Sequence, residues 1–348
     1  MSVENAGLIG AATAALAAAV SALLIVVLKP LLQRYALARP NARSSHRIPT
    51  PQGGGIAVVA AALLCAVAGL VLSGHGEALP GFAVLAAGAA GLGLVGAVDD
   101  IRPLPPALRL VFQALAVAAV VAGAGTGRLF PAMPAAAEWL LIGLAGVWFV
   151  NLVNFMDGLD WMTVAEMVPL TAALALFALA GWLDPASGLI AAGLLGGLVG
   201  FAPFNRPVAR LFLGDVGSLP IGLIVGFLLY RLAGMGGAST NGALAAAVLL
   251  PLYYVTDATV TLLRRLARRE RVWEAHRSHF YQRATDNGWT VPAVVGHVAG
   301  LNVALAALAA VTLAFALPVV EVACVVAGFG LVAGTLVRFS RKPAGGGG

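Results

Sequence analysis

The sequence predicts an all-α, polytopic transmembrane bundle of about eleven spans. Of the 348 residues, 60% are hydrophobic and only 10% are charged, and the mean hydropathy is +0.94. Soluble globular domains carry about 25% charged residues, so this composition excludes that class. Apolar runs also follow one another along the whole chain, each near the roughly 20 residues that a membrane-crossing helix needs. The runs do not alternate as barrel strands would, which leaves helices as the spanning element.

Proline, glycine and charged residues interrupt these runs and set the expected boundaries of the helices. The first run lacks a basic segment before it and a clear cleavage site after it, so an uncleaved helix is predicted rather than a signal peptide. The pair of runs around Asp184-Pro185 also admits another division. The expected spans of this single membrane domain lie near 7–28, 54–73, 81–98, 107–124, 138–155, 163–182, 187–203, 217–233, 242–262, 292–316 and 321–337.

The basic residues predict how these spans are oriented. Of the 21 Lys and Arg residues, all but Arg128 and Arg231 fall on one side of the predicted arrangement. The positive-inside rule assigns that side to the cytoplasm, which puts the N-terminus outside and a tail over 338–348 in the cytoplasm. The net charge of +6 is therefore a topological signal, and basic loops strung between membrane spans do not indicate nucleic-acid binding.

Five acidic residues gather on the same predicted cytoplasmic side: Asp99, Asp100, Asp157, Asp160 and Asp215. Carboxylates at a membrane-proximal helix end cost free energy unless they are hydrated, paired or bound to a cation. A solvated helix end would explain any one of them. Five from three separate loops favour one shared site.

The adjacent pair Asp99-Asp100 ends the third predicted span just before Pro103, where proline stops the helix. At a helix end both carboxylates can reach one polar pocket. One could hold Mg²⁺ while the other acts as a base toward a phosphate, because Mg²⁺ takes few carboxylates and keeps oxygen ligands from its phosphate substrate. An Asp-Asp pair is a weak signal when it stands alone.

A more specific signal is the segment NLVNFMDGLD, residues 151–160, in which Asn154, Asp157 and Asp160 recur every three residues. On a helical turn this spacing aligns one amide and two carboxylates along one edge. Such a row can ligate a metal or bind a ribose and base. A polar helix cap is the alternative, but two Asn and two Asp in ten residues exceed what one cap needs.

A third segment, NRPVARLFLGDVGS, places Asp215 between Gly214 and Gly217. Glycines let a loop bring backbone N–H groups close to a phosphate, and the carboxylate is a natural metal ligand. Phe212 could stack on a nucleobase, although packing is the commoner role of an aromatic residue beside a span.

The long loop after the ninth predicted span contains HRSHFYQR, residues 276–283, whose dense Arg and His donors suit a diphosphate. Anchoring to the inner leaflet explains the preceding arginines 264, 265, 268, 269 and 271 equally well. The same two interpretations apply to His46 and Arg47, which precede a glycine-rich turn. Asp257 is the one carboxylate expected inside a span, as a functional residue or as a buried partner of an arginine.

Together these motifs resemble the polyprenyl-phosphate N-acetylhexosamine-1-phosphate transferases, a family that includes phospho-N-acetylmuramoyl-pentapeptide transferase and the O-antigen-initiating transferases. The resemblance extends from about residue 43 to residue 283. It implies dependence on Mg²⁺, with Mn²⁺ as a substitute, and an active site on the cytoplasmic face of the bacterial inner membrane. The implied donor is a UDP-N-acetylhexosamine and the implied acceptor is undecaprenyl phosphate in the lipid bilayer, with release of UMP. A homodimer is compatible with the resemblance. The motifs are SSHRIPTPQGGG, VDD, NLVNFMDGLD, FNRPVARLFLGDVGS and HRSHFYQR.

The resemblance also implies roles for individual residues. Asp215 resembles the position of the family's principal Mg²⁺ ligand, with Asn154 or Asp100 nearby. Asp99 resembles the position of the base that acts on the acceptor phosphate. The implied uridine pocket is lined by Asn205, Asp157, Asp160 and Phe212. The implied contacts to the diphosphate and the rest of the substrate come from His276, Arg277, His279, Arg283, His46 and Arg47.

Two departures from the family pattern refine the expectation. The muramoyl-pentapeptide branch carries three consecutive histidines where this chain has HRSH, which favours an O-antigen or related surface-glycan role. Trp161 stands where many members have glycine. The expected mechanism is direct attack of the acceptor phosphate on the β-phosphorus of the UDP-sugar, with an aspartyl-phosphate route through Asp99 or Asp100 as the rival. A transporter of lipid-linked precursors is the alternative from another class, and it predicts broken helices and polar residues at the bilayer midplane.

Overall fold

The computed structural model describes residues 3–38, 49–235, 242–272 and 276–342. Ten of its helices are long and apolar enough to cross a membrane, and one bent pair brings the number of candidate spans to eleven within these residues. The predicted helical bundle of about eleven spans is therefore confirmed. The helices are α1 (Val3–Tyr35), α2 (Gly55–Leu72), α3 (Leu79–Ile101), α4 (Pro106–Gly123), α5 (Ala135–Met156), α6 (Met162–Leu179), α7 (Pro185–Asn205), α8 (Asp215–Gly234), α9 (Ala243–Leu249), α10 (Leu252–Ala267), α11 (Phe280–Asp286), α12 (Val291–Phe315) and α13 (Pro318–Phe339).

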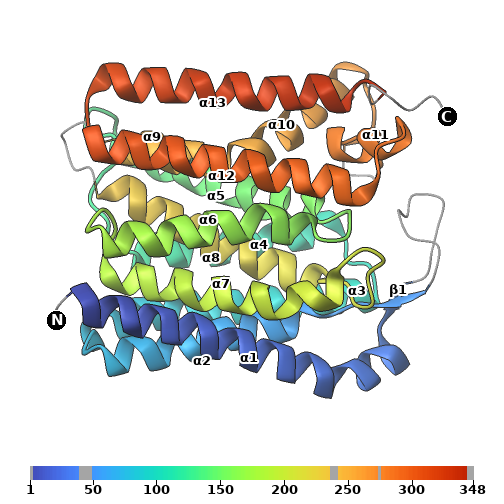
Figure 1. Ribbon diagram of the computed structural model, residues 1–348, viewed down its shortest axis with the longest axis horizontal. Helices are drawn as coiled ribbons and strands as arrows, with labels where there is room; N and C mark the ends of the chain where they lie inside the picture. The colour runs from blue at the N-terminus through green and yellow to red at the C-terminus, as the bar shows by residue number, and fades with distance from the viewer. Residues whose placement is uncertain (1–2, 39–48, 236–241, 273–275, 343–348) are drawn as a thin grey trace.

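The helices run side by side along one axis, and α1 begins at the end of the bundle opposite to the one where α13 finishes (Figure 1). An odd number of crossings requires this arrangement of the termini. Which end faces the cytoplasm stays a prediction from the basic residues. A short antiparallel pair, β1 (Leu37–Ala38) and β2 (Thr50–Pro51), lies at the end where α13 finishes.

Two predicted spans differ from the observed helices for physical reasons. The first helix continues past the expected residue 28 to Tyr35, through Pro30, because hydropathy marks only the apolar part of a longer helix. The ninth span, predicted as continuous over 242–262, is wrong in that respect: it divides into α9 and α10, which meet at 62°. Pro251 lies at this break, and proline has no N–H with which to continue a helical ladder.

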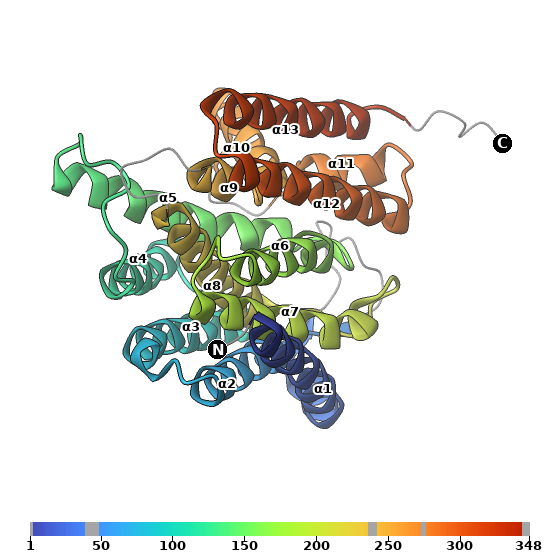
Figure 2. The same ribbon diagram turned by 60° about the vertical axis from the view of Figure 1, so that its left-hand side comes forward.

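Glycines on α7 allow α1 and α2 to pack closely against it. A Cβ added at Gly196 would lie 2.1 Å from the Ala14 carbonyl oxygen of α1, and one at Gly193 would lie 2.6 Å from the Ala62 oxygen of α2. Figure 2 shows α7 between α1 and α6 in the middle of the molecule. Small residues are the usual contact between membrane helices because they let backbones approach and gain dispersion energy.

Glycines also let α8 pack closely against its neighbours, and this sets the position of Asp215 at the start of α8. A Cβ added at Gly96 on α3 would lie 2.3 Å from the backbone carbonyl of Asp215, and one at Gly55 on α2 would lie 2.1 Å from the Cα of Gly217. The first turn of α8 is thus held directly against the backbones of two neighbouring helices.

Candidate active site

A cavity of about 280 Å³ opens among the ends of α3, α5 and α8 and the turns that join α5 to α6 and α7 to α8. It brings together residues from all three acidic segments that the sequence singled out, although Asp99 is not part of its lining. The predicted residues that line it are Asp100, Asn154, Asp157, Asp160, Asn205, Phe212 and Asp215.

Asp215 and Asn154 join α8 to α5 at this cavity. The amide nitrogen of Asn154 donates to Oδ1 of Asp215 at 2.7 Å and to Oγ of Ser218 at 3.0 Å. Asp215 is the first residue of α8 and follows Gly214, whose φ of +76° is one that a glycine adopts without strain. Two oxygen-bearing side chains therefore meet where two membrane helices end.

Asp100 caps the N-terminus of α8 from another helix. Its two carboxylate oxygens accept the backbone N–H groups of Asp215 at 3.0 Å and Val216 at 3.2 Å. A carboxylate at this position satisfies free N–H donors and interacts favourably with the helix dipole. Sequence spacing cannot reveal this capping function, because the two residues involved are 115 positions apart. Direct metal ligation by Asp100 stays a prediction.

Asp99 makes its hydrogen bonds to α4 and to the turn before it. It accepts the backbone N–H of Leu104 at 2.6 Å and a guanidinium N–H of Arg109 at 2.6 Å, and the same Arg109 nitrogen lies 3.6 Å from Oδ2 of Asp215. Sequence reasoning missed Arg109 by counting it only as an inner-side charge. The proline-rich turn between α3 and α4 was the available signal, since it folds the first turn of α4 back onto Asp99.

Asp157 and Asp160 lie in the turn after α5, so the predicted helical row beyond Asn154 is wrong, although all three residues line the cavity. Asp157 accepts the hydroxyl of Thr163, and Asp160 accepts the backbone N–H of Ala209 at 2.9 Å. Burial raises the pKa of Asp157 to about 6, and the negative charges of Asp100 and Asp160 add to the effect. The cavity thus concentrates more negative charge than its own residues neutralise.

Asn205 is buried, and its side chain makes hydrogen bonds to backbone groups. It accepts the N–H of Trp161 at 2.7 Å and donates to the Leu211 carbonyl at 2.9 Å. Trp161 has a φ of +64°, a conformation that glycine adopts more readily, and its indole N–H donates to the Ala202 carbonyl at 2.6 Å. These bonds explain how a tryptophan is held at a position where the family often has glycine.

Phe212 lines the cavity from a strand-like segment beside β2. Its N–H donates to the Pro51 carbonyl at 2.9 Å, and its carbonyl accepts the N–H of Gly54 at 2.9 Å. The glycine-rich turn after β2 therefore supports the wall of the cavity through its backbone. Stacking of Phe212 on a nucleobase stays a prediction.

Asp257 is fully buried and holds the start of α11. It accepts the backbone N–H groups of Phe280 at 3.0 Å and Tyr281 at 3.3 Å, and the Nδ1 of His279 lies 3.3 Å from it. Of the two interpretations, the buried partner fits these contacts, with a histidine and a helix terminus in place of the expected arginine. A second intramembrane carboxylate, Glu166 on α6, is also fully buried and was not among the predicted residues.

The HRSHFYQR segment contributes to the cavity through Gln282, which the sequence analysis did not select. The hydroxyl of Tyr281 donates to the Phe155 carbonyl at 3.1 Å, which attaches α11 to the end of α5. His279 is buried, and Arg277 pairs with Asp286 at 3.2 Å. Arg277 and Arg283 line a separate basic pocket. His46 and Arg47 lie outside the described residues.

Comparisons with known proteins match this arrangement to one family. The model of glycosyl transferase family 4 matches residues 82–233. A phospho-N-acetylmuramoyl-pentapeptide-transferase of Symbiobacterium thermophilum is 32% identical over 62% of this chain and 71% of its own length. The chain belongs to glycosyl transferase family 4. It is therefore an enzyme, which removes the transporter alternative even though one span is broken.

Two further relatives of this family 4 transferase differ in their printed activities. A probable undecaprenyl-phosphate N-acetylglucosaminyl 1-phosphate transferase of Bacillus subtilis is 26% identical over 76% of the chain and 75% of the relative. A decaprenyl-phosphate N-acetylglucosaminephosphotransferase of Mycobacterium tuberculosis is 30% identical over 60% of the chain and 56% of the relative. The segment matched by the family model contains every predicted acidic residue of the cavity.

The donor set of the transferase fits a divalent cation that relies on phosphate oxygens for most of its ligands. Among the described residues, no group of three or more His, Cys, Asp or Glu side chains could hold a metal ion by itself. Mg²⁺ needs only one or two protein carboxylates when substrate phosphates complete its shell. Asp215, with the Asn154 amide beside it, provides that minimum in a cavity with excess negative charge.

His276 of the transferase is expected to carry no charge at neutral pH. Burial lowers its pKa to about 4, and the neighbouring His279 and Arg265 add to this. Ser278 donates its backbone N–H to Nδ1 at 3.3 Å, so the ring proton resides on Nε2. The residue can offer a hydrogen-bond donor, but it does not add the positive charge that the sequence analysis expected of this segment.

This shift predicts how stability depends on pH. The unfolded chain protonates His276 near pH 6.5 and the folded chain only near pH 4, so this residue makes stability fall as pH drops through that window. His276→Gln keeps an acceptor for Ser278 and should reduce the loss of thermal midpoint between about pH 7.5 and pH 5 by a few degrees. Thermal unfolding in detergent at both pH values measures it. An equal loss in the variant and the wild type would contradict the prediction.

Proposed function

We propose that the protein transfers an N-acetylhexosamine-1-phosphate from a UDP-sugar to undecaprenyl phosphate and releases UMP. In this proposal the product is the first lipid-linked intermediate of a surface glycan such as O-antigen, made at the cytoplasmic face of the inner membrane. One observation carries the proposal: the acidic cavity lies at the ends of two helices, α5 and α8, that also line a larger apolar cavity.

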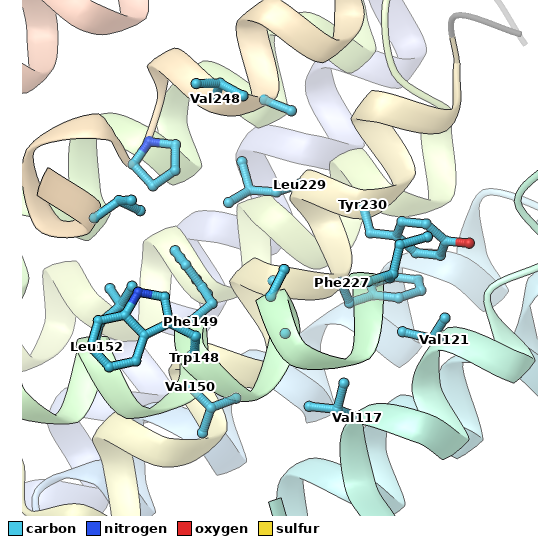
Figure 3. Close-up of a pocket in the computed structure, with 18 of the residues that line it drawn as sticks. Val117, Val121, Trp148, Phe149, Val150, Leu152, Phe227, Leu229, Tyr230 and Val248 are labelled. Atoms are coloured by element: carbon cyan, nitrogen blue, oxygen red, sulfur yellow. The ribbon is translucent and has the colours of Figure 1, made fainter. Parts of the chain in front are cut away.

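The apolar cavity has a volume of about 470 Å³ and is lined by α4, α5 and α8, with further lining from α9, α10 and α13. Figure 3 shows Val117, Phe149, Leu229 and Val248 around this space. On α8 its lining begins at Gly222, seven residues after Asp215, or about 10 Å along the helix. A prenyl chain in this cavity would therefore extend toward the acidic site with its phosphate leading.

The side chains along α4 become less polar from the acidic cavity toward the apolar cavity. Arg109, Gln113 and Val117 follow one another at single-turn spacing on α4, with Arg109 beside Asp215 and Val117 in the apolar cavity. Between them, Gln113 accepts the side-chain N–H of Asn151 at 2.5 Å. This order suits an amphiphile, with hydrocarbon at Val117, a polar belt at Gln113 and an anionic head at Arg109.

The acidic cavity suits the nucleotide sugar. Asp157 and Asp160 can accept hydrogen bonds from ribose and base, Phe212 offers an aromatic face, and Gln282 offers both a donor and an acceptor. Arg277 and Arg283 line another pocket, so we assign no diphosphate contact to them. Asp215 lines the acidic cavity about 10 Å along α8 from the apolar lining, and in this proposal the acceptor phosphate meets the donor diphosphate beside it.

We place Mg²⁺, or Mn²⁺ in its place, on Asp215 with the Asn154 amide beside it. A bound divalent cation supplies charge neutralisation between the phosphates. Arg109, oriented by Asp99, holds the acceptor phosphate near Asp215. An oxygen of that phosphate attacks the β-phosphorus of the UDP-sugar, a new P–O bond forms, and the bond to the UMP oxygen breaks.

Four hydrogen bonds to Asp99 and Asp100 favour this direct route over an aspartyl-phosphate intermediate. Both oxygens of Asp100 accept backbone N–H groups of α8, and both oxygens of Asp99 are hydrogen-bonded to Leu104 and Arg109. A carboxylate engaged on both oxygens is a poor nucleophile, since attack requires it to give up one of those bonds. The pairing with Arg109 also supports a positioning function for Asp99 beside its predicted role as a base.

The decisive experiment uses purified protein in detergent with Mg²⁺, undecaprenyl or decaprenyl phosphate and a panel of UDP-sugars. UMP and the lipid product are measured by mass. Lipid-diphosphate-sugar formed from a UDP-N-acetylhexosamine and lost with EDTA would support the proposal. The relatives named phospho-N-acetylmuramoyl-pentapeptide-transferase support a second candidate, so UDP-N-acetylmuramoyl-pentapeptide belongs in the panel. Product from that donor alone would replace the O-antigen assignment.

Arg109→Gln is expected to weaken use of the lipid acceptor. The change removes a charged hydrogen-bond donor that contributes about 1.5–3 kcal/mol in such contacts, so the KM for undecaprenyl phosphate should rise roughly tenfold to a hundredfold. The KM for the UDP-sugar should change far less. Arg102→Gln, at an exposed arginine just after α3, is the control. Equal acceptor KM values for the two variants would remove Arg109 from the acceptor site.

A further inference from the structure

A second polar pocket, of about 220 Å³, lies beside α11. Whereas Gln282 of α11 faces the acidic cavity, Arg283 and the preceding Arg277 line this second pocket. The remaining basic lining comes from α10 and the residue after it: Arg264, Arg265 and Arg268. We propose that this arginine pocket binds the phosphate headgroup of an anionic phospholipid.

The pocket has more positive charge than its carboxylates neutralise. Arg265 pairs with Glu270 at 3.0 Å, and Arg277 pairs with Asp286 at 3.2 Å. Within the part of the chain that the structure describes, no carboxylate lies within ion-pair distance of Arg264, Arg268 or Arg283. Guanidinium groups gathered around one space repel one another, and an anion with several oxygens relieves that repulsion.

One buried donor in the pocket also lacks an acceptor. The Nε of Arg277 is buried and has no hydrogen-bond partner among the described residues. A buried donor without a partner costs free energy that an acceptor would recover. Phosphate oxygens are the acceptors that guanidinium forks bind best.

Two of the arginines are held against an aromatic ring before any ligand binds. The guanidinium groups of Arg264 and Arg283 both lie over the ring of Phe280, at 5.2 and 5.6 Å from its centre. Stacking of this kind reduces the side-chain entropy that binding would otherwise remove. The pocket is therefore a built site rather than a set of mobile surface charges.

The surroundings favour a lipid over a free phosphate. Leu263 and Leu266 on α10 are 56% and 59% exposed, beside Arg264 and within one turn of Arg268. The α10 arginines of the pocket lie in the last turn of that helix and just after it, at the end of a candidate membrane span, where phospholipid headgroups are found. A phospholipid would place its phosphate among the arginines and its acyl chains on these leucines.

The test compares the full-length double variant Arg264→Gln/Arg268→Gln with Arg269→Gln, which alters an exposed arginine of the same run that does not line the pocket. Binding of phosphatidylglycerol and phosphatidylcholine to detergent-purified protein is titrated by native mass spectrometry. Wild type and Arg269→Gln should prefer phosphatidylglycerol. The double variant should bind it about thirtyfold more weakly, which corresponds to roughly 1 kcal/mol for each arginine.

Competition then separates the sources of phosphate. Glycerol 3-phosphate, inorganic pyrophosphate and a UDP-sugar are each added at millimolar concentration to protein loaded with phosphatidylglycerol. Retention of the lipid supports the proposal. Equal lipid binding by the double variant and Arg269→Gln would overturn it, as would displacement by any of the soluble phosphates. Because the readout is lipid binding, the outcome is independent of whether the proposed transfer reaction is correct.

Discussion

Asp215→Asn is expected to lower turnover about a thousandfold or more while leaving the protein folded. The substitution removes the carboxylate that we propose as the principal cation ligand in the acidic cavity, and the charge stabilisation that a bound cation supplies there amounts to several kcal/mol. The fold should survive because Asn154 can still donate to the new side chain, and Asp100 still caps α8. Removing one negative charge from a crowded acidic cavity should also leave the thermal midpoint unchanged or raise it. Turnover and thermal unfolding on the same preparation measure both effects.

The control for this prediction is Glu77→Gln, which removes one carboxylate from a side chain that is 74% exposed and lies outside the cavity. It should retain wild-type turnover. Full activity in Asp215→Asn would remove this residue from the mechanism, whereas a large fall in its thermal midpoint would mean that the carboxylate has a structural function instead.

Gly96→Ala is expected to lower kcat about a hundredfold without altering any polar group of the site. The added methyl group would lie 2.3 Å from the backbone of Asp215, so the first turn of α8 must move away from α3. A displacement of about 1 Å at a catalytic group typically costs a factor of a hundred in rate. Overpacking should also lower stability by about 1–3 kcal/mol. Steady-state kinetics and unfolding by detergent titration measure the two losses.

Gly91→Ala is the matched control, because it makes the same change on the same helix where no atom lies within 4 Å of the new methyl group. It should behave as wild type or gain slightly in helix propensity. If Gly96→Ala were equally active, the close contact between α3 and α8 would have no part in positioning Asp215.

The motif residues of the acidic cavity were predictable because carboxylates and amides are rare in this apolar chain and are the groups that bind cations and nucleotides. Asp100, Asn154, Asp157, Asp160 and Asp215 were selected as scarce polar residues on one side of an apolar chain, and they do line one cavity. Arg109 and Gln282 were not selected, since neither residue type is unusual in an inner loop or a short helix. Their functions arise from the turn after α3 and from the docking of α11 onto α5.

The contacts of the individual side chains in the HRSHFYQR segment could not be predicted from the motif. The density of basic residues indicated one anion site, but in the structure these residues lie in different places. His279 is buried against Asp257, whereas Arg277 and Arg283 line a second pocket. Sequence spacing cannot show this division, because the direction in which a loop side chain points depends on the partner that caps its helix.

By itself, the sequence determined the membrane bundle, its number of spans and the family of the enzyme, because these depend on hydropathy and on motifs that are contiguous in the chain. Only the tertiary structure decided which groups meet: Asp100 with the N-terminus of α8, Arg109 with Asp99 and Asp215, and Asp257 with α11. The physical reason is that an unpaired N–H group or charge is costly at a membrane-embedded site, and the partner that satisfies it can come from any segment that the packing of the helices brings near.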